Sequence, residues 1–128
     1  RYLKKGIQNK ILIIGQGTIL ERALDVVNNL EESKRKKISL IDLFRSKPFP
    51  INLNLILQRY HTIISIDEQT KPGGFGSLLK ENLKKTTNIV EMCLADKFIF
   101  ENLGRDRLLD KYGLSKNLIK RNILKNIK

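Results

Sequence analysis

Cysteine, histidine and tryptophan are scarce in this sequence, and their scarcity argues against several kinds of site. Cys93 is the single cysteine, His61 is the single histidine, and tryptophan is absent. One cysteine allows no internal disulfide, which is typical of a reducing compartment such as the cytoplasm. We interpret Cys93 as a small buried side chain rather than a nucleophile. A histidine without a second histidine, a cysteine pair or a carboxylate cluster nearby does not predict a metal site.

Long apolar runs and an initiating methionine are also missing. The longest apolar runs, such as residues 11–14, span four residues, far fewer than the roughly 20 that cross a bilayer. No apolar stretch of signal-peptide length follows the basic first residues. We therefore expect no membrane partner. We expect residues 1–128 to form a single domain that is a fragment of something longer or is trimmed at its start.

Acidic residues are few relative to basic ones. Thirteen Asp and Glu against 25 Lys and Arg give a formal net charge of +12, a surplus that can indicate a polyanionic partner. The basic residues are nevertheless spread along the chain. Their densest cluster, residues 34–37, falls in an expected turn, and the basic final helix has no aromatic residue for base stacking. We favour a solvated basic surface, with a nucleic-acid-binding α/β module as the less favoured alternative.

What the sequence does contain is an alternation of strand-like apolar runs with helical periods. Strands are expected over residues 10–15, 37–42, 62–67 and 88–94, and helices over 18–32, 52–59, 75–84, 105–112 and 116–127. The unbroken apolar run of the first strand is typical of a strand that is buried on both faces. Strand–helix repetition at this density predicts parallel strands with right-handed crossovers, and hence a three-layer α/β/α sandwich.

Local signals mark where three of these helices begin or end. Thr18 is expected to cap the first helix, with Glu21 completing a capping box. Gly113 stands where it would end the 105–112 helix. Ser115 is expected to cap the final helix.

Two glycine motifs occur where a strand gives way to a helix. Gly15-Gln16-Gly17-Thr18 follows the first strand, where backbone amides at a helix start can hold phosphate. Leu20 occupies the position at which the dinucleotide fingerprint needs a third glycine, so we interpret this motif as a structural turn. Gly73-Gly74-Phe75-Gly76-Ser77 predicts a tight loop that faces a neighbouring domain or a dimer partner, or a turn that inserts Phe75 into the core. The two interpretations are compatible.

An acidic pair, Asp67-Glu68, stands at the carboxyl end of the third expected strand, where sites of α/β proteins lie. Adjacent carboxylates point in different directions from a strand, so they form a poor acid/base pair. We expect this pair to bind an arginine or lysine from elsewhere in the protein. On these grounds we assign no catalytic, cofactor-binding or metal-binding residue to this chain.

Taken in order along the chain, these motifs resemble the transketolase C-terminal domain family. The matching segments are residues 11–18, 38–43 with Lys47-Pro48, 63–68 with 73–77, 96–98, 104–105 and 111–114. The Lys-Pro turn, the acidic pair and the Gly-Gly-Phe-Gly-Ser motif at these separations carry the resemblance. The ending at residues 112–114 is similar to that of the sugar-processing branch, which includes transketolases and 1-deoxy-D-xylulose-5-phosphate synthases.

The resemblance implies a mixed, mostly parallel five-stranded sheet, with residues 1–3 as the remnant of a first strand. It also implies the third domain of a dimeric enzyme that transfers ketol units between sugar phosphates, with thiamine diphosphate and magnesium held by the other two domains. This chain would then be inactive alone, would bind no cofactor alone and would support assembly. The alternatives are a domain of a 2-oxo-acid dehydrogenase beta component and a subunit of a split transketolase.

Overall fold

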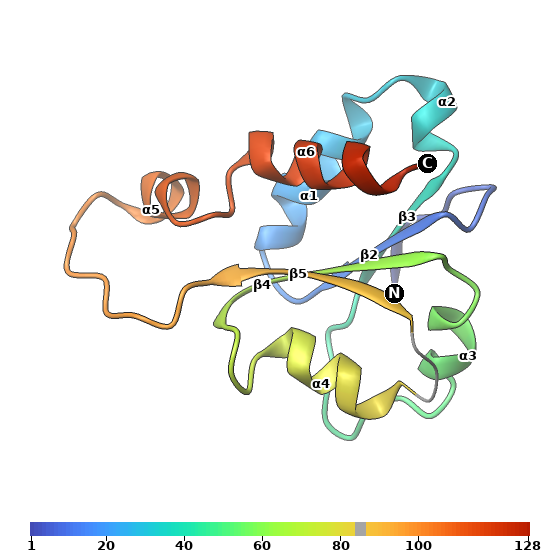
Figure 1. Ribbon diagram of the computed structural model, residues 1–128, viewed down its shortest axis with the longest axis horizontal. Helices are drawn as coiled ribbons and strands as arrows, with labels where there is room; N and C mark the ends of the chain where they lie inside the picture. Colours follow the sequence, from blue (N-terminus) through green and yellow to red (C-terminus); the bar gives the residue numbers. More distant parts are fainter. Residues whose placement is uncertain (84–86) are drawn as a thin grey trace.

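The computed structural model describes residues 1–83 and 87–128, which form one mixed sheet with helices packed around it (Figure 1). The strands are β1 (Tyr2–Lys4), β2 (Ile11–Gly15), β3 (Ile38–Asp42), β4 (Thr62–Thr70) and β5 (Asn88–Leu94). They form a five-stranded sheet in the order β1-β3-β2-β4-β5. β1 is antiparallel to β3, and the other neighbouring pairs are parallel. The expected mixed, mostly parallel sheet is confirmed.

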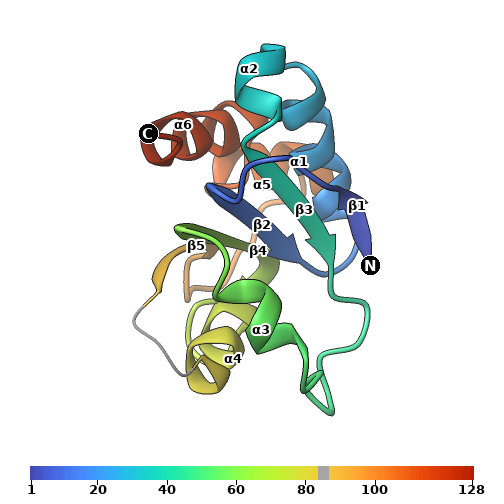
Figure 2. The same cartoon turned by 90° about the vertical axis from the view of Figure 1, so that its right-hand side faces the viewer.

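Helices cover both faces of this sheet, so the expected three-layer α/β/α sandwich is also confirmed. The helices are α1 (Ile19–Asn28), α2 (Glu32–Arg35), α3 (Leu53–Leu57), α4 (Phe75–Asn82), α5 (Arg105–Lys111) and α6 (Lys116–Asn126). Figure 2 shows α1, α2 and α6 on one side of the sheet and α3 and α4 on the other. No helix within residues 1–83 and 87–128 is long and apolar enough to span a membrane.

The central strand β2 explains why the chain adopts three layers. Ile11 and Ile13 belong to the apolar cluster beneath α1 and α6, whereas Leu12 and Ile14 belong to the cluster beneath α3 and α4. All four side chains are fully buried. Successive residues of a strand face opposite sides, so an unbroken apolar run needs helices on both faces.

The first helix is shorter than the sequence predicts. α1 ends at Asn28 with Asn29 as its C-cap, and the separate helix α2 begins at Glu32, where the expected 18–32 helix would end. The Asn29 side-chain amide donates a hydrogen bond to the Asp25 carbonyl oxygen at 2.8 Å, and such local bonding competes with continuation of a helix. The predicted capping box at Thr18 is wrong, because the Thr18 backbone is already helical and its side chain makes no capping bond. The predicted end of the 75–84 helix at Lys84 lies outside the described residues.

Other boundaries follow the sequence more closely. Ser115 caps α6 and accepts a hydrogen bond from the Leu118 N–H at 3.2 Å. Gly113 follows the C-cap of α5 with a φ of 98°, as expected of a glycine that ends a helix. β4 continues three residues beyond the predicted end, because Thr70 pairs with Leu94 after an irregularity in the ladder. At the other edge, Tyr2 and Lys4 pair with β3, so the first strand of the fold is present.

Candidate functional site

The carboxyl ends of the parallel strands β2, β3 and β4 lie at the same end of the sheet, and the loops that follow them contain the sequence motifs. The turn after β2 contains Gly15 and Gly17, the loop after β3 contains Lys47 and Pro48, and the loop after β4 leads into the glycine-rich start of α4. The Lys47–Pro48 peptide bond is cis. Ligand sites of open α/β sheets lie at this edge, so the fold brings together segments that are far apart in the sequence.

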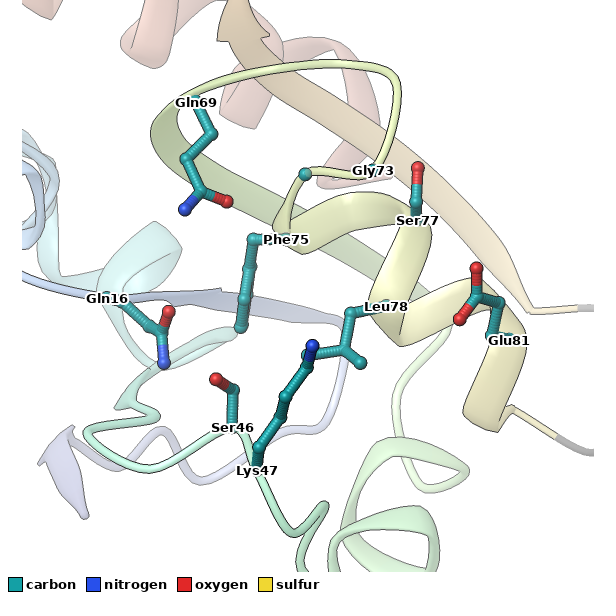
Figure 3. Close-up of a pocket in the computed structure, with 10 residues that line it drawn as sticks. Gln16, Ser46, Lys47, Gln69, Gly73, Phe75, Ser77, Leu78 and Glu81 are labelled. Carbon is teal, nitrogen blue, oxygen red and sulfur yellow. The ribbon is translucent and has the colours of Figure 1, made fainter.

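A pocket of about 240 Å³ lies between these loops. Its lining residues are Gln16, Ser46, Lys47, Gln69, Gly73, Gly74, Phe75, Ser77, Leu78 and Glu81. Figure 3 shows Gln16, Ser46 and Phe75 around a common space, with the Lys47 side chain extending from its loop toward α4. The pocket lining is mainly polar, and its charged residues are one lysine and one glutamate.

Most of the expected contact loop reaches this pocket. Gly73, Gly74, Phe75 and Ser77 line it, while Gly76 faces β5 instead. A Cβ atom added to Gly76 would lie 2.6 Å from the Glu91 carboxylate, so this glycine permits the close approach of α4 to the sheet. Phe75 is 2% exposed and belongs to the apolar cluster beneath α3 and α4. The interpretation that the turn inserts Phe75 into the core is therefore confirmed.

Asp67 holds the loop that precedes α4. Its carboxylate is buried and accepts a hydrogen bond from the Phe75 N–H at 2.8 Å. Burial raises the pKa of Asp67, the Glu91 carboxylate raises it further, and the N–H groups of Phe75 and Gln69 lower it. Since Asp67 occupies the first amide of α4, that amide is not free to bind an external anion.

Glu68 points away from Asp67 and forms a surface ion pair with Arg105. The Arg105 Nε lies 3.1 Å from the Glu68 carboxylate, and a second guanidinium nitrogen contacts both Glu68 and the Thr18 hydroxyl, the latter at 2.7 Å. The Thr18 hydroxyl therefore accepts a hydrogen bond from Arg105 and makes no capping bond to α1. The sequence predicted a basic partner for the acidic pair. In the structure Glu68 binds Arg105, whereas Asp67 accepts a hydrogen bond from a backbone N–H instead.

The sequence did not identify Gln16, Ser46 or Gln69 as site residues. The Gln16 side chain donates to the Leu43 carbonyl oxygen at 2.7 Å and thereby joins the ends of β2 and β3. The sequence feature that could have identified Gln16 is its position between two glycines at the end of a buried strand. Ser46 and Gln69 lie in loops whose approach depends on the sheet, and no local pattern marks them.

Cys93 and His61 do not line this pocket. Cys93 is half-buried on β5, and burial raises the pKa of its thiol. His61 is exposed at the start of β4. Across residues 1–83 and 87–128, no three His, Cys, Asp or Glu side chains are grouped to hold a metal ion.

Comparison with known proteins decides the family. The family model for the transketolase, C-terminal domain, matches residues 2–119. This chain belongs to the transketolase C-terminal domain family. The matched range contains the Lys47-Pro48 turn, the Asp67-Glu68 pair and the glycine-rich start of α4.

Curated relatives extend this result. The chain is 30% identical over 128 residues to a 1-deoxy-D-xylulose-5-phosphate synthase from Haemophilus influenzae and 30% identical over 122 residues to one from Clostridium tetani. The alignments cover 97% and 92% of this chain but 19% of each relative. This transketolase C-terminal domain therefore spans about a fifth of the length of the curated relatives that it matches.

A solved structure agrees with the fold. The chain matches a protein described as "Split gene transketolase, inactive beta4 tetramer" with a TM-score of 0.79 and 23% sequence identity. The match covers 99% of this chain and 41% of the other. At this identity the comparison shows the fold alone, and it agrees with the five-stranded α/β/α architecture of this chain.

The pH dependence of stability tests the role of Asp67. Because its pKa is raised in the folded chain, the folded state binds a proton more readily than the unfolded state between the ordinary value of about 3.9 and the raised value. This group's contribution to the free energy of unfolding therefore falls as pH rises through that window. An asparagine side chain cannot titrate, so we expect the destabilisation caused by Asp67→Asn to shrink from pH 3 to pH 7. Urea unfolding of both proteins across this range measures the difference, and a destabilisation that grows with pH would contradict the assignment.

Proposed function

We propose that residues 1–128 are the C-terminal assembly domain of a thiamine-diphosphate-dependent enzyme of the transketolase type that acts on sugar phosphates. The observation that supports this most strongly is the family match over residues 2–119 together with alignments that cover 19% of the curated relatives. A domain of that proportion leaves most of the enzyme to other segments. We propose that those segments hold the catalytic centre and that the enzyme works as a homodimer in the cytoplasm, consistent with the single cysteine.

The described residues that line the pocket fit thiamine diphosphate and magnesium poorly. Mg²⁺ bound with a diphosphate takes one or two carboxylates besides the phosphate oxygens, and Glu81 is the single carboxylate among these lining residues. The Phe75 amide at the start of α4, which would suit a diphosphate, is bound to Asp67 at 2.8 Å. The pocket beside it combines Lys47 with Glu81. We therefore propose that this domain takes part in no catalytic step.

We propose that the Gly73–Ser77 loop contacts the neighbouring domain or the dimer partner through the pocket that it lines. The Ser77 hydroxyl is held by the Lys71 carbonyl oxygen at 2.9 Å, and Asp67 holds the Phe75 amide. The loop is thus fixed before any partner binds, which lowers the entropy lost on docking. Lys47 and Gln69, which also line the pocket, are exposed and offer polar groups to an incoming segment.

A second candidate has its own support. The structural match to a protein described as a split gene transketolase supports a version in which this domain lies on a separate subunit. The synthase relatives favour the sugar-processing branch over the beta component of 2-oxo-acid dehydrogenases. Both candidates give the domain the same role in assembly, and they differ in the polypeptide that carries it.

Native size distinguishes these candidates. An immunoblot of source-cell extract with an antibody against this chain is expected to show a polypeptide much larger than 14.8 kDa. A native gel should then show a still larger complex. A polypeptide of lower mass than the synthase relatives, together with a second polypeptide that copurifies with it, would support the candidate in which this domain lies on a separate subunit. A lone 14.8 kDa protein without a copurifying partner would contradict the proposal.

A further inference from the structure

The fold gathers basic residues from four distant segments at one end of the domain. Lys10 and Lys37 directly precede the parallel strands β2 and β3, and Arg59 lies three residues before β4. Because neighbouring parallel strands begin at the same end of a sheet, these residues lie opposite the end that carries the Gly73–Ser77 loop. Figure 2 views the domain from the side that carries α2 and α3.

Backbone hydrogen bonds hold the segments that precede these strands together. The Lys36 carbonyl oxygen accepts a bond from the Ile7 N–H at 2.8 Å, which joins the turn before β3 to the loop before β2. The Lys10 carbonyl oxygen accepts a bond from the Thr62 N–H at 3.1 Å, which joins the starts of β2 and β4. The positions of the lysines are therefore fixed by the sheet.

The end of α6 completes this surface. Ile127, just after α6, belongs to the same apolar cluster as Leu30, which lies shortly before α2. Figure 1 shows the C-terminus on the same side of the domain as α2. We call the basic side chains of four ranges the amino-end basic face, namely those within residues 4–10, 31–37, 59–61 and 125–128.

The amino-end basic face carries most of the net charge of the chain. Its four ranges contain ten Lys and Arg against two Glu, a net eight of the twelve positive charges. Both glutamates pair with lysines of their own segment, at 3.5 and 2.8 Å. Among residues 1–83 and 87–128, no carboxylate forms an ion pair with Lys5, Lys10, Lys37 or Lys125. These four ammonium groups are available to an external anion.

The chemistry of this face suits a chain of phosphates. Eight of its ten basic residues are lysines, which bind phosphate as point charges, whereas planar carboxylates are best bound by the fork of an arginine. The single aromatic residue within the four ranges, Tyr60, is 6% exposed. Unpaired bases would therefore find no ring on which to stack. A duplex, which presents phosphates rather than bases on its outside, fits this surface better than a single strand.

A second copy of the chain offers this face few partners. Most carboxylates outside the face already pair with basic residues of the same chain, among them Glu68, Asp106 and Asp110. An anionic ligand from outside the chain is therefore favoured over self-association.

We propose that the amino-end basic face binds the phosphate backbone of double-stranded nucleic acid without base specificity. Along the sequence the basic residues are spread and favour a solvated surface, but their meeting on one face of the fold favours a polyanionic ligand. The activity is separate from the assembly role, because this face lies opposite the Gly73–Ser77 loop. Binding through phosphates releases counterions, so affinity should fall steeply with salt.

Fluorescence anisotropy with the full-length protein and a labelled random-sequence duplex of about 20 base pairs, at about 50 to 200 mM salt, tests this proposal. The change is the joint replacement of four unpaired lysines by glutamine: Lys5→Gln, Lys10→Gln, Lys37→Gln and Lys125→Gln. At about 100 mM salt this variant is expected to bind at least about tenfold more weakly, with a slope of log affinity against log salt that is smaller by about 2 to 4.

A matched control removes four exposed basic side chains from the other end of the domain. Its substitutions are Arg45→Gln, Lys71→Gln, Lys97→Gln and Arg107→Gln, at residues that are exposed and lie in the loops after β3, β4 and β5 and in α5. Both variants lose the same charge, so the control should change affinity less than about twofold if binding is confined to the amino-end basic face. Circular dichroism checks that each variant is folded.

The outcomes decide between this surface and its alternatives. Binding of a DNA duplex, an RNA duplex or both, weakened mainly by the four lysine substitutions, supports the proposal. Equal weakening by the two variants would assign the binding to overall charge and overturn it, as would the absence of binding at about 100 mM salt. Competition by polyglutamate as effective as competition by unlabelled duplex would assign the face to an acidic protein partner and would also overturn it.

Discussion

Gly15→Ala is expected to lower the free energy of unfolding by about 3 kcal/mol or more, at the upper end of the range for overpacked cores. Gly15 ends the central strand β2 and lies opposite Ile66 of β4 in a parallel register. A Cβ atom at Gly15 would lie 2.1 Å from the Ile66 backbone carbonyl oxygen. Because this atom belongs to the backbone of a paired strand, it cannot move aside as a flexible side chain can. Urea unfolding, followed by circular dichroism, measures the change.

Gly17→Ala is the matched control for this prediction. Gly17 lies in the same turn with a φ of 78°, and apart from Gly17 and its two chain neighbours no heavy atom of the described residues lies within 4 Å of a Cβ added there. Its substitution should cost about 1 kcal/mol, from the left-handed backbone alone. Equal destabilisation by the two substitutions would contradict the account, because it would show that β2 and β4 separate at this end without loss of stability.

Phe75→Ala is expected to lower the free energy of unfolding by about 3–5 kcal/mol, as large-to-small changes of buried aromatic residues do. Phe75 is 2% exposed, packs in the cluster beneath α3 and α4, and begins the helix whose first amide Asp67 binds. The substitution leaves a cavity under the candidate contact loop. It should therefore both destabilise the domain and loosen the 67–75 loop, which thermal unfolding and limited proteolysis would detect.

Phe98→Ala provides the control at the surface. Phe98 is 88% exposed and lies in the irregular segment between β5 and α5. Its substitution should change the free energy of unfolding of the isolated domain by less than about 0.5 kcal/mol. A loss at Phe75 no greater than the loss at Phe98 would show that the glycine-rich motif does not anchor α4.

The central sheet could be predicted because its signals are local. Residues 11–14 form an unbroken apolar run, and a strand buried on both faces is the structure that such a run favours. The Ser115 cap and the Gly113 helix end are set by the chemistry of single residues. These features depend on neighbours within a few positions, so the sequence is enough to locate them.

The missed features depend on contacts between distant segments. Threonine is a residue type that often caps helices, but the Thr18 hydroxyl accepts a hydrogen bond from Arg105, 87 positions later in the chain. The sequence predicted a basic partner for the acidic pair without identifying Arg105, because the approach of α5 to β4 depends on the whole fold. The polar pocket was missed for the same reason, because the distant segments that line it come together only when the sheet forms.

Calorimetric titration with thiamine diphosphate and magnesium tests the central claim, that this is an assembly domain whose chemistry lies elsewhere. The native complex purified from source cells is expected to bind the cofactor in a magnesium-dependent way. The isolated 128-residue chain, shown by circular dichroism to be folded, is expected to give no binding heat. Tight, magnesium-dependent binding by the isolated chain would contradict the account, because it would place the cofactor site within this domain.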